Sequence, residues 1–169
     1  MPIVCATSAD IPALTRLVNS AYRGEGGWTN ESHLLDGTRT NEAGIAELMQ
    51  QPDSMILKYV GLEDTEMAAG CVYLHKQGDK LYLGMLSVDP TRQGSGIGKD
   101  LLEAAIVYAR EIGCVRIRIT VIAVRSELIA WYERHGYRRT GEVEPFHAGE
   151  KFGIQKQPLE LVVLEKEVD

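Results

Sequence analysis

A cluster of glycines stands where a strand-like stretch of the sequence gives way to helical periodicity. It reads Gln93-Gly94-Ser95-Gly96-Ile97-Gly98, with Arg92 and Lys99 on either side. Glycines let the chain bend so that backbone N–H groups without a helical partner converge at a helix start. The helix dipole adds about half a positive charge at that end. Such a nest can bind a phosphate or pyrophosphate without basic side chains.

Two familiar phosphate-binding motifs do not match this cluster. A Walker A loop requires GxxxxGK and then Ser or Thr, but Asp100 follows Lys99 and Gln93 replaces the first glycine. The dinucleotide pattern GxGxxG is also missing, because the glycines fall at 94, 96 and 98. A helix entry turn that needs only positive φ stays open as an alternative.

Periodicity predicts the elements that position this cluster. Strand-like segments lie at residues 3–6, 55–62, 67–76, 81–88, 115–122, 137–142 and 159–166. Apolar residues at helical spacing predict helices over roughly 11–22, 41–49, 97–112 and 125–134. The order β-α-α-β-β-β-α-β-α-β-β mixes hairpins with helical crossovers. We therefore expect an α+β domain with a mixed sheet.

Two motifs in this order resemble those of a known family. The pattern QxxGxG at Gln93–Gly98, after a strand that ends Leu86-Ser87-Val88, resembles the coenzyme A loop of the GNAT acetyltransferases. The segment Leu128–Tyr137, LIAWYERHGY, is similar to the family's late-helix motif. The element order agrees over residues 2–166, so the resemblance covers nearly the whole chain.

The resemblance implies a fold and a domain organisation. We expect a mixed, mostly antiparallel central sheet of roughly six or seven strands flanked by about four helices. The sheet should be splayed at the strands before and after the glycine loop. Residues 1–169 would form a single N-acetyltransferase domain.

The resemblance also implies where coenzyme A binds. Backbone groups of Leu86 and Val88 would bond the pantetheine arm in the gap between the splayed strands, and the amides of residues 94–99 would hold the pyrophosphate. The full set of implied positions is Leu86, Ser87, Val88, Arg92, Gln93, Gly94, Ser95, Gly96, Ile97, Gly98, Lys99 and Arg125.

Tyr132 stands where the family's late helix carries a tyrosine beside the thioester sulfur. A thiol has a pKa of about 8.5 and a phenol of about 10, so tyrosine stays protonated at neutral pH and can protonate a departing thiolate. Tyr132 and Trp131 could equally be core residues of an amphipathic helix. Arg125, two turns earlier, replaces the motif's usual asparagine. It either reaches the cofactor or substrate or is a solvated residue at the helix start.

Several groups are candidates for the general base. Many family members carry a glutamate on the strand before the loop, and its place here is taken by Tyr82 or Gly84. An alkylammonium with a pKa of about 10.4 must lose a proton before it attacks. The candidates are a water chain or the titratable residues of two loops, Glu31, His33, Asp36, His147 and Glu150.

The same loops, residues 22–39 and 144–157, are expected to cover the acetyl end of the cofactor. Aromatic side chains would supply apolar walls and carboxylates negative charge. The predicted substrate residues are Tyr22, Trp28, Glu31, His33 and Asp36, with Phe146 and Glu150 from the later loop. This lining suits a small cationic amine. An acceptor that carries a carboxylate would instead be anchored by Arg23, Arg39 or Arg125.

Composition limits the partners. The chain has 169 residues and a net charge of −6, so general nucleic-acid binding is not expected. No apolar run has the length of a membrane span and the first residues do not resemble a signal peptide, so we expect a cytoplasmic location. Cys5, Cys71 and Cys114 are interpreted as buried reduced thiols. The histidines show no metal-ligand spacing, so no metal is expected.

These features predict an acetyl-CoA-dependent N-acetyltransferase. The acceptor would be a primary amine of a small molecule or a peptide, and it would attack directly in a ternary complex because no cysteine offers an acyl-enzyme. One alternative is a degenerate GNAT-fold module that binds acyl-CoA without turnover, and another is a phosphate- or dinucleotide-binding domain. The protein would be a monomer, or a homodimer formed through an exposed Val162 or Val163.

Overall fold

The computed structural model describes residues 3–23, 35–36, 40–60, 68–92, 95–145, 154–155 and 159–168. Its helices are α1 (Ile11–Arg23), α2 (Glu42–Gln50), α3 (Ile97–Glu111) and α4 (Ser126–Arg134). Its strands are β1 (Ile3–Cys5), β2 (Leu35–Asp36), β3 (Ser54–Val60), β4 (Ala68–Gln77), β5 (Lys80–Val88), β6 (Arg116–Ile122), β7 (Arg138–Pro145), β8 (Ile154–Gln155) and β9 (Glu160–Glu167). Short 3₁₀ turns lie at Ser8–Asp10 and Pro90–Arg92.

The central sheet has seven strands in the order β1-β3-β4-β5-β6-β9-β7. Every neighbouring pair is antiparallel except β5 and β6, which run parallel. A second, two-stranded sheet joins β2 to β8. The predicted mixed, mostly antiparallel sheet with flanking helices is therefore confirmed.

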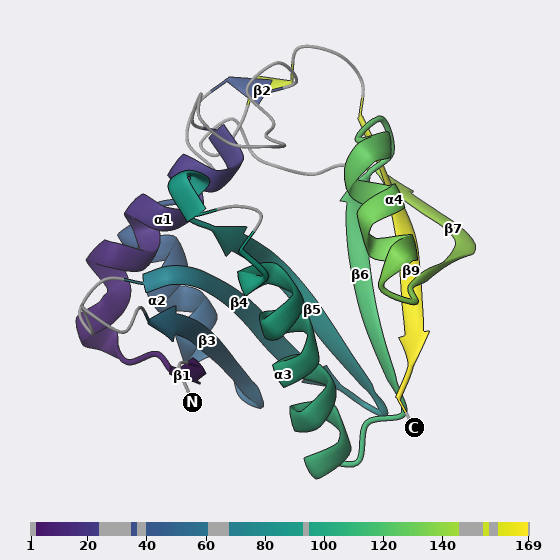
Figure 1. Ribbon diagram of the computed structural model, residues 1–169, viewed down its shortest axis with the longest axis horizontal. Helices are drawn as coiled ribbons and strands as arrows, with labels where there is room; N and C mark the ends of the chain where they lie inside the picture. Colours follow the sequence, from purple (N-terminus) through teal and green to yellow (C-terminus); the bar gives the residue numbers. More distant parts are fainter. Residues whose placement is uncertain are drawn as a thin grey trace.

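Helices cover both faces of the sheet. On one face, α3 and α4 pack on a cluster that includes Leu81, Leu101, Ile117 and Ile129. On the other face, α1 and α2 pack on a second cluster over β3, β4 and β5. Figure 1 shows α3 lying across β4 and β5, and α4 lying beside β6 and β9. The crossover that joins β5 to β6 is therefore α3, which places the start of this helix at the end of β5.

The parallel strands β5 and β6 stay together only at their beginning. Their paired residues are Lys80 with Arg116, Leu81 with Ile117, and Tyr82 with Arg118. Beyond Tyr82 the two strands diverge, and Figure 1 shows them separating from a common point near the C-terminus. The splayed sheet that the resemblance implied is present.

An irregularity in β5 lies within the splayed stretch. The register with β4 shifts between the pair Tyr73–Gly84 and the pair Cys71–Ser87, so β5 carries an extra residue there. Met85 has a φ of 55°, in the left-handed region that most side chains avoid. A bulge of this kind bends the bulged strand and strengthens its local twist. The bulge thus lies in the stretch of β5 that has already left its parallel partner.

Three expectations about individual residues are wrong. Cys5 is exposed, whereas Cys71 and Cys114 are buried as expected. Val162 and Val163 are not exposed, since their exposed fractions are 7% and 0%. The reason is that β9 lies between β6 and β7 and β7 is the edge strand.

In the part of the chain that is described, no helix is both long enough and apolar enough to cross a membrane.

Candidate functional site

The glycine loop connects the end of β5 to the start of α3. After Val88, the Asp89 amide donates a 2.8 Å hydrogen bond to the carbonyl of Ala69 on β4. The 3₁₀ turn Pro90–Arg92 follows, and Ser95 Oγ donates to the Arg92 carbonyl. Gln93 and Gly94 lie outside the described residues. The described part of the loop is therefore tied to β4 at Asp89, and Ser95 ties its end back to the 3₁₀ turn.

Gly96 is the N-cap residue of α3 and has φ 87° and ψ 5°. This left-handed conformation favours glycine. Among the described residues, no atom would lie within 4 Å of a Cβ placed on Gly96. The helix bonding begins with the Asp100 amide, which donates to the Gly96 carbonyl at 3.0 Å. The amides of residues 97–99 precede that first bond and are the ones that can bind an anion.

Gly98 is needed for a different reason. A Cβ on Gly98 would lie 3.2 and 3.3 Å from two ring carbons of Trp131 and 3.7 Å from Val88 Cγ2. The first turn of α3 thus lies against the Trp131 indole of α4 and against the end of β5. Trp131 connects the glycine loop to the late-helix motif, two segments that the sequence separates by more than 30 residues.

Tyr132 lies on the buried side of α4, with 6% of its surface exposed. Its ring makes edge contacts with Trp131 at 5.1 Å and with Tyr137 at 5.6 Å between centroids. The structure therefore brings Tyr132 next to the residue that contacts the loop. The role of Tyr132 as an acid stays a prediction.

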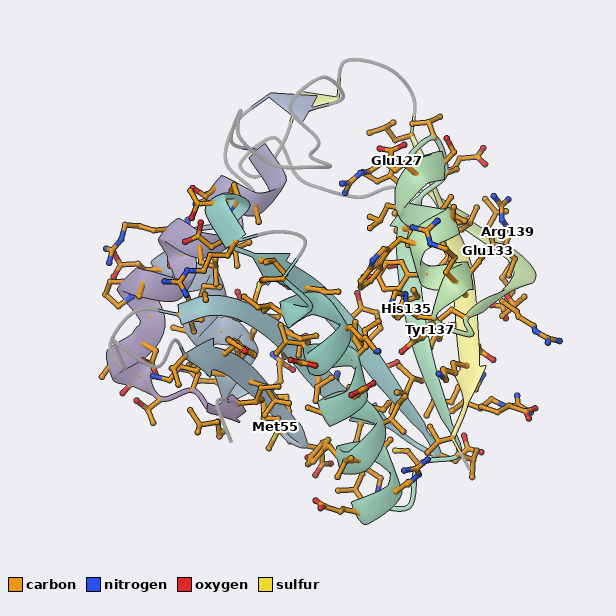
Figure 2. The ribbon with its side chains drawn as sticks, in the orientation of Figure 1. Met55, Glu127, Glu133, His135, Tyr137 and Arg139 are labelled. Carbon is orange, nitrogen blue, oxygen red and sulfur yellow. The ribbon has the colours of Figure 1, made fainter. Side chains whose placement is uncertain are left out.

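Tyr137 and His135 complete an aromatic group at the end of α4. The His135 ring lies 4.3 Å from the Trp131 ring, and its Nδ1 is 2.7 Å from the Trp131 carbonyl oxygen. Tyr137 is 1% exposed, and its hydroxyl has no hydrogen-bond partner among the described residues. Burial raises the pKa of this phenol, so it stays protonated. Figure 2 shows His135 and Tyr137 at this end of α4, with Glu133 and Arg139 on the outer side.

Arg125 is the N-cap residue of α4, and its carbonyl accepts from the amides of Leu128 and Ile129. Its side chain is buried, with 4% exposed. The alternative of a solvated residue at the helix start is therefore wrong. The other alternative, contact with the cofactor or substrate, stays a prediction.

The last residues of β5 line the splay. Leu86 and Val88 are half-buried against the α3 cluster, whereas Ser87 is 2% exposed and its Oγ donates to the Met85 carbonyl at 3.1 Å. Along this stretch β5 has no paired residue on β6. Its backbone edge can therefore bond an extended ligand, as the resemblance implies for Leu86 and Val88.

The two loops expected at the acetyl end meet in the small sheet. Leu35 pairs with Gln155 and Asp36 with Ile154. Figure 1 shows this pair at the end of the molecule toward which β5 and β6 diverge. The structure gives only the backbone of Tyr22 and Asp36. The remaining predicted loop residues lie outside the described part of the chain: Trp28, Glu31, His33, Phe146, His147 and Glu150.

Sequence reasoning missed two features of the site. One is the contact of Trp131 with Gly98. The sequence shows a tryptophan directly before Tyr132, but this residue points to the glycine loop only once both segments are placed in one fold. The other is the position of Tyr82, whose ring lies over Gly84. The only sequence signal for it is a glycine two residues after a tyrosine on one strand face.

The sequence matches a known family. A profile of the acetyltransferase (GNAT) family matches residues 28–137. Among curated relatives, the mycothiol acetyltransferase of Saccharopolyspora erythraea is 28% identical over 136 residues, 79% of this chain and 42% of that protein. The spermine/spermidine N(1)-acetyltransferase of Bacillus subtilis is 30% identical over 78 residues, 46% of this chain and 50% of that protein. The match thus spans half or less of these relatives.

Solved structures share the fold. The ribosomal-protein-S18-alanine N-acetyltransferase of Escherichia coli superposes with a TM-score of 0.74 at 17% identity, covering 99% of this chain and 93% of that one. The ribosomal-protein-alanine N-acetyltransferase of Brucella melitensis has a TM-score of 0.71 at 22% identity, covering 99% of both chains. At these identities the likeness concerns the fold alone.

Proposed function

Because this chain belongs to the acetyltransferase (GNAT) family, we propose that it transfers an acetyl group from acetyl-CoA to a primary amine. The observation that carries the proposal is the end of β5–β6 pairing at Tyr82 and Arg118, together with the glycine-capped start of α3 that follows the far end of β5. An unpaired strand edge and an open nest of amides then follow one another along the chain. This is what a ligand with an extended amide arm and a pyrophosphate requires.

The residues of this chain fit coenzyme A without a basic pocket. No described atom lies within 4 Å of a Cβ on Gly96, which leaves room for a phosphate at the amides of residues 97–99. Arg92 and Lys99 are exposed beside this nest and can add charge-assisted bonds. Leu86 and Val88 offer backbone groups to the pantetheine arm. Bound there, acetyl-CoA supplies an activated acyl group.

Tyr132 supplies the proton for the leaving group in this proposal. The amine nitrogen bonds to the carbonyl carbon, the carbon–sulfur bond breaks, and Tyr132 gives its phenolic proton to the sulfur. The nitrogen releases its own proton to solvent, and water returns a proton to Tyr132. The products are an amide and free coenzyme A.

The burial and the positions of the cysteines agree with direct attack of the amine on the thioester. Cys71 is 0% exposed and Cys114 is 4% exposed, so neither meets a substrate. Burial raises the pKa of the Cys114 thiol, which disfavours the nucleophilic thiolate. Cys5 is on the edge strand β1, which β3 and β4 separate from β5. An acyl-enzyme on cysteine is therefore not part of the proposal.

For the acceptor, we propose a small cationic amine. The support is the pairing of β2 with β8, which joins two loops that carry Glu31, Asp36 and Glu150 in sequence. The test is a panel of size-matched amines, with and without a carboxylate near the nitrogen. A preference for the cationic members is expected, and a preference for the carboxylate-bearing ones would reject this choice of acceptor.

A second candidate function is an acyl-CoA-binding module without turnover. It is favoured by the absence of a carboxylate at Tyr82 and Gly84, the two β5 positions expected for a base. Calorimetry with acetyl-CoA, followed by steady-state thiol release with the amine panel, separates the two. Binding with turnover supports the transferase, and binding without release of coenzyme A supports the module.

A further inference from the structure

We propose that the Tyr82 hydroxyl receives the proton that the attacking amine gives up. The inference rests on the proposed acetyl transfer, and it assigns the proton acceptor that β5 lacks as a carboxylate. Three observations carry it: the position of the ring over Gly84, the end of strand pairing at Tyr82, and the neighbours that hold the ring.

The Tyr82 ring is folded along its own strand. A Cβ on Gly84 would lie 2.8 Å from Tyr82 Cε1, 3.0 Å from the hydroxyl oxygen and 3.1 Å from Cζ. The hydroxyl end of the ring, rather than its base, therefore lies over Gly84. Any larger residue at position 84 would displace it, so the glycine gives the phenol its place.

This place is inside the splay. Tyr82 is the last residue of β5 that pairs with β6, opposite Arg118. Gly84 follows it, on the stretch of β5 that has no β6 neighbour. The ring thus carries its hydroxyl from the paired part of the strand into the part where we place the reactive arm of the cofactor.

Neighbours from β4 fix the ring from the other side. Tyr73 pairs with Gly84 and its buried ring contacts the Tyr82 ring edge-on, at 6.4 Å and 66°. His75 pairs with Tyr82 itself. Tyr82 is only half-buried, and the structure shows no hydrogen bond from its hydroxyl to any described residue. The hydroxyl is therefore held in position and available to a substrate.

The charged side chain that pairs with Tyr82 across β5 and β6 is already neutralised by carboxylates. Arg118, opposite Tyr82 on β6, bonds Glu142 at 2.8 Å and Glu165 at 3.0 Å. Lys80 also donates to Glu165, at 3.1 Å. These ion pairs join β5, β6, β7 and β9 where the splay begins, so the guanidinium is engaged with carboxylates. The phenol is then the polar group that β5 presents where the strands part.

The proton balance of the step is complete. The bound alkylammonium gives one proton to Tyr82 Oη while the Tyr82 hydroxyl proton passes to water, which leaves a neutral amine. As the nitrogen–carbon bond forms and the carbon–sulfur bond breaks, the second nitrogen proton leaves by the same relay. Tyr132 protonates the sulfur and is itself reprotonated by water. The relay returns Tyr82 to its starting state and needs no stable phenolate.

Tyr82→Phe tests the relay because it keeps the ring over Gly84 and against Tyr73. We expect kcat to fall by about 100-fold, with the acetyl-CoA Kd within about twofold of wild type. The rate of the variant should rise with pH where the wild-type rate is level, since it then depends on amine that has already lost its proton. Tyr73→Phe, which removes the neighbouring hydroxyl, is the matched control and should keep the wild-type pH profile.

Three other outcomes would overturn the proposal, each for a different reason. A Tyr82→Phe variant within about threefold of wild type, with an unchanged pH profile, shows that the hydroxyl takes no part. Loss of acetyl-CoA binding in that variant shows a packing role instead. A wild-type protein that binds acetyl-CoA but acetylates no amine refutes the proposed function itself, before any variant is compared.

Discussion

Replacing Gly96 by alanine tests two roles of the glycine at the start of α3. One is to adopt a left-handed backbone conformation, and the other is to leave room for the pyrophosphate. Its φ is +87°, and a Cβ there would lie more than 4 Å from every atom of the described part of the chain. Alanine therefore meets no clash, and only its left-handed backbone costs free energy, about 1–2 kcal/mol. Each 1 kcal/mol lowers the Tm of a domain of this size by about 2–4 °C. The methyl group also enters the open space beside the amide nest.

Gly113 provides a matched control at the other end of the helix. Its φ is +78° and its Cβ would also meet no described atom within 4 Å, so Gly113→Ala carries the same backbone cost. The 15 residues of α3, about 22 Å along the axis, and the C-cap residue Ile112 lie between the two glycines. We expect both variants to lose a similar amount of Tm.

Calorimetry with acetyl-CoA distinguishes the two glycines. Disturbing one hydrogen bond to a charged phosphate costs about 1.5–3 kcal/mol, which weakens binding by about 10–100-fold. We expect this loss for Gly96→Ala and wild-type affinity for Gly113→Ala. Equal affinities in the two variants would refute the placement of the pyrophosphate. A wild-type Tm in Gly96→Ala would refute the backbone argument.

Three further changes test other parts of the account. Tyr132→Phe keeps the ring contacts and removes the acid, so kcat should fall by about 10²–10⁴-fold at nearly constant acetyl-CoA affinity; a fall below about threefold would leave only packing. Tyr137→Phe removes a buried hydroxyl without a described partner, so the free energy of unfolding should stay level or rise by about 1 kcal/mol; a clear loss in urea titration would show a hidden partner. Burial acts to raise the Asp10 pKa, but Lys58 at 2.7 Å and the Thr7 amide outweigh it and hold this pKa below 3.8. Asp10→Asn should therefore destabilise the protein above pH 3.8, and its difference from wild type should vanish as the pH falls below that value; a pH-independent difference would contradict the ion pair.

Residue patterns predicted the elements because their signals are local. Helix α3 has apolar residues at helical spacing, and glycines stand at both of its ends, Gly96 and Gly113. Strand β5 alternates between buried and half-buried residues along its whole length, as its sequence suggests. The order of the elements then fixed the fold class and the place of the loop.

Long-range features of the site could not be predicted in this way. The bulge at Met85 depends on the register with β4, and Met85 is an ordinary apolar residue in an alternating strand. The splay was expected only from the family resemblance. Strands β2 and β8 have two residues each, too few to show any period. The contacts of Trp131 with Gly98 and of Tyr82 with Gly84 exist only once the strands and helices are packed.

The central claim is acetyl transfer to an amine at the splay between β5 and β6. It is tested most directly by one reaction in which free thiol and acetylated amine are quantified together, by thiol detection and mass spectrometry. The account predicts equal amounts of the two products, both reduced in Tyr132→Phe. Thiol release without acetylated amine, or acetyl-CoA bound and unchanged with every amine of the panel, would contradict it.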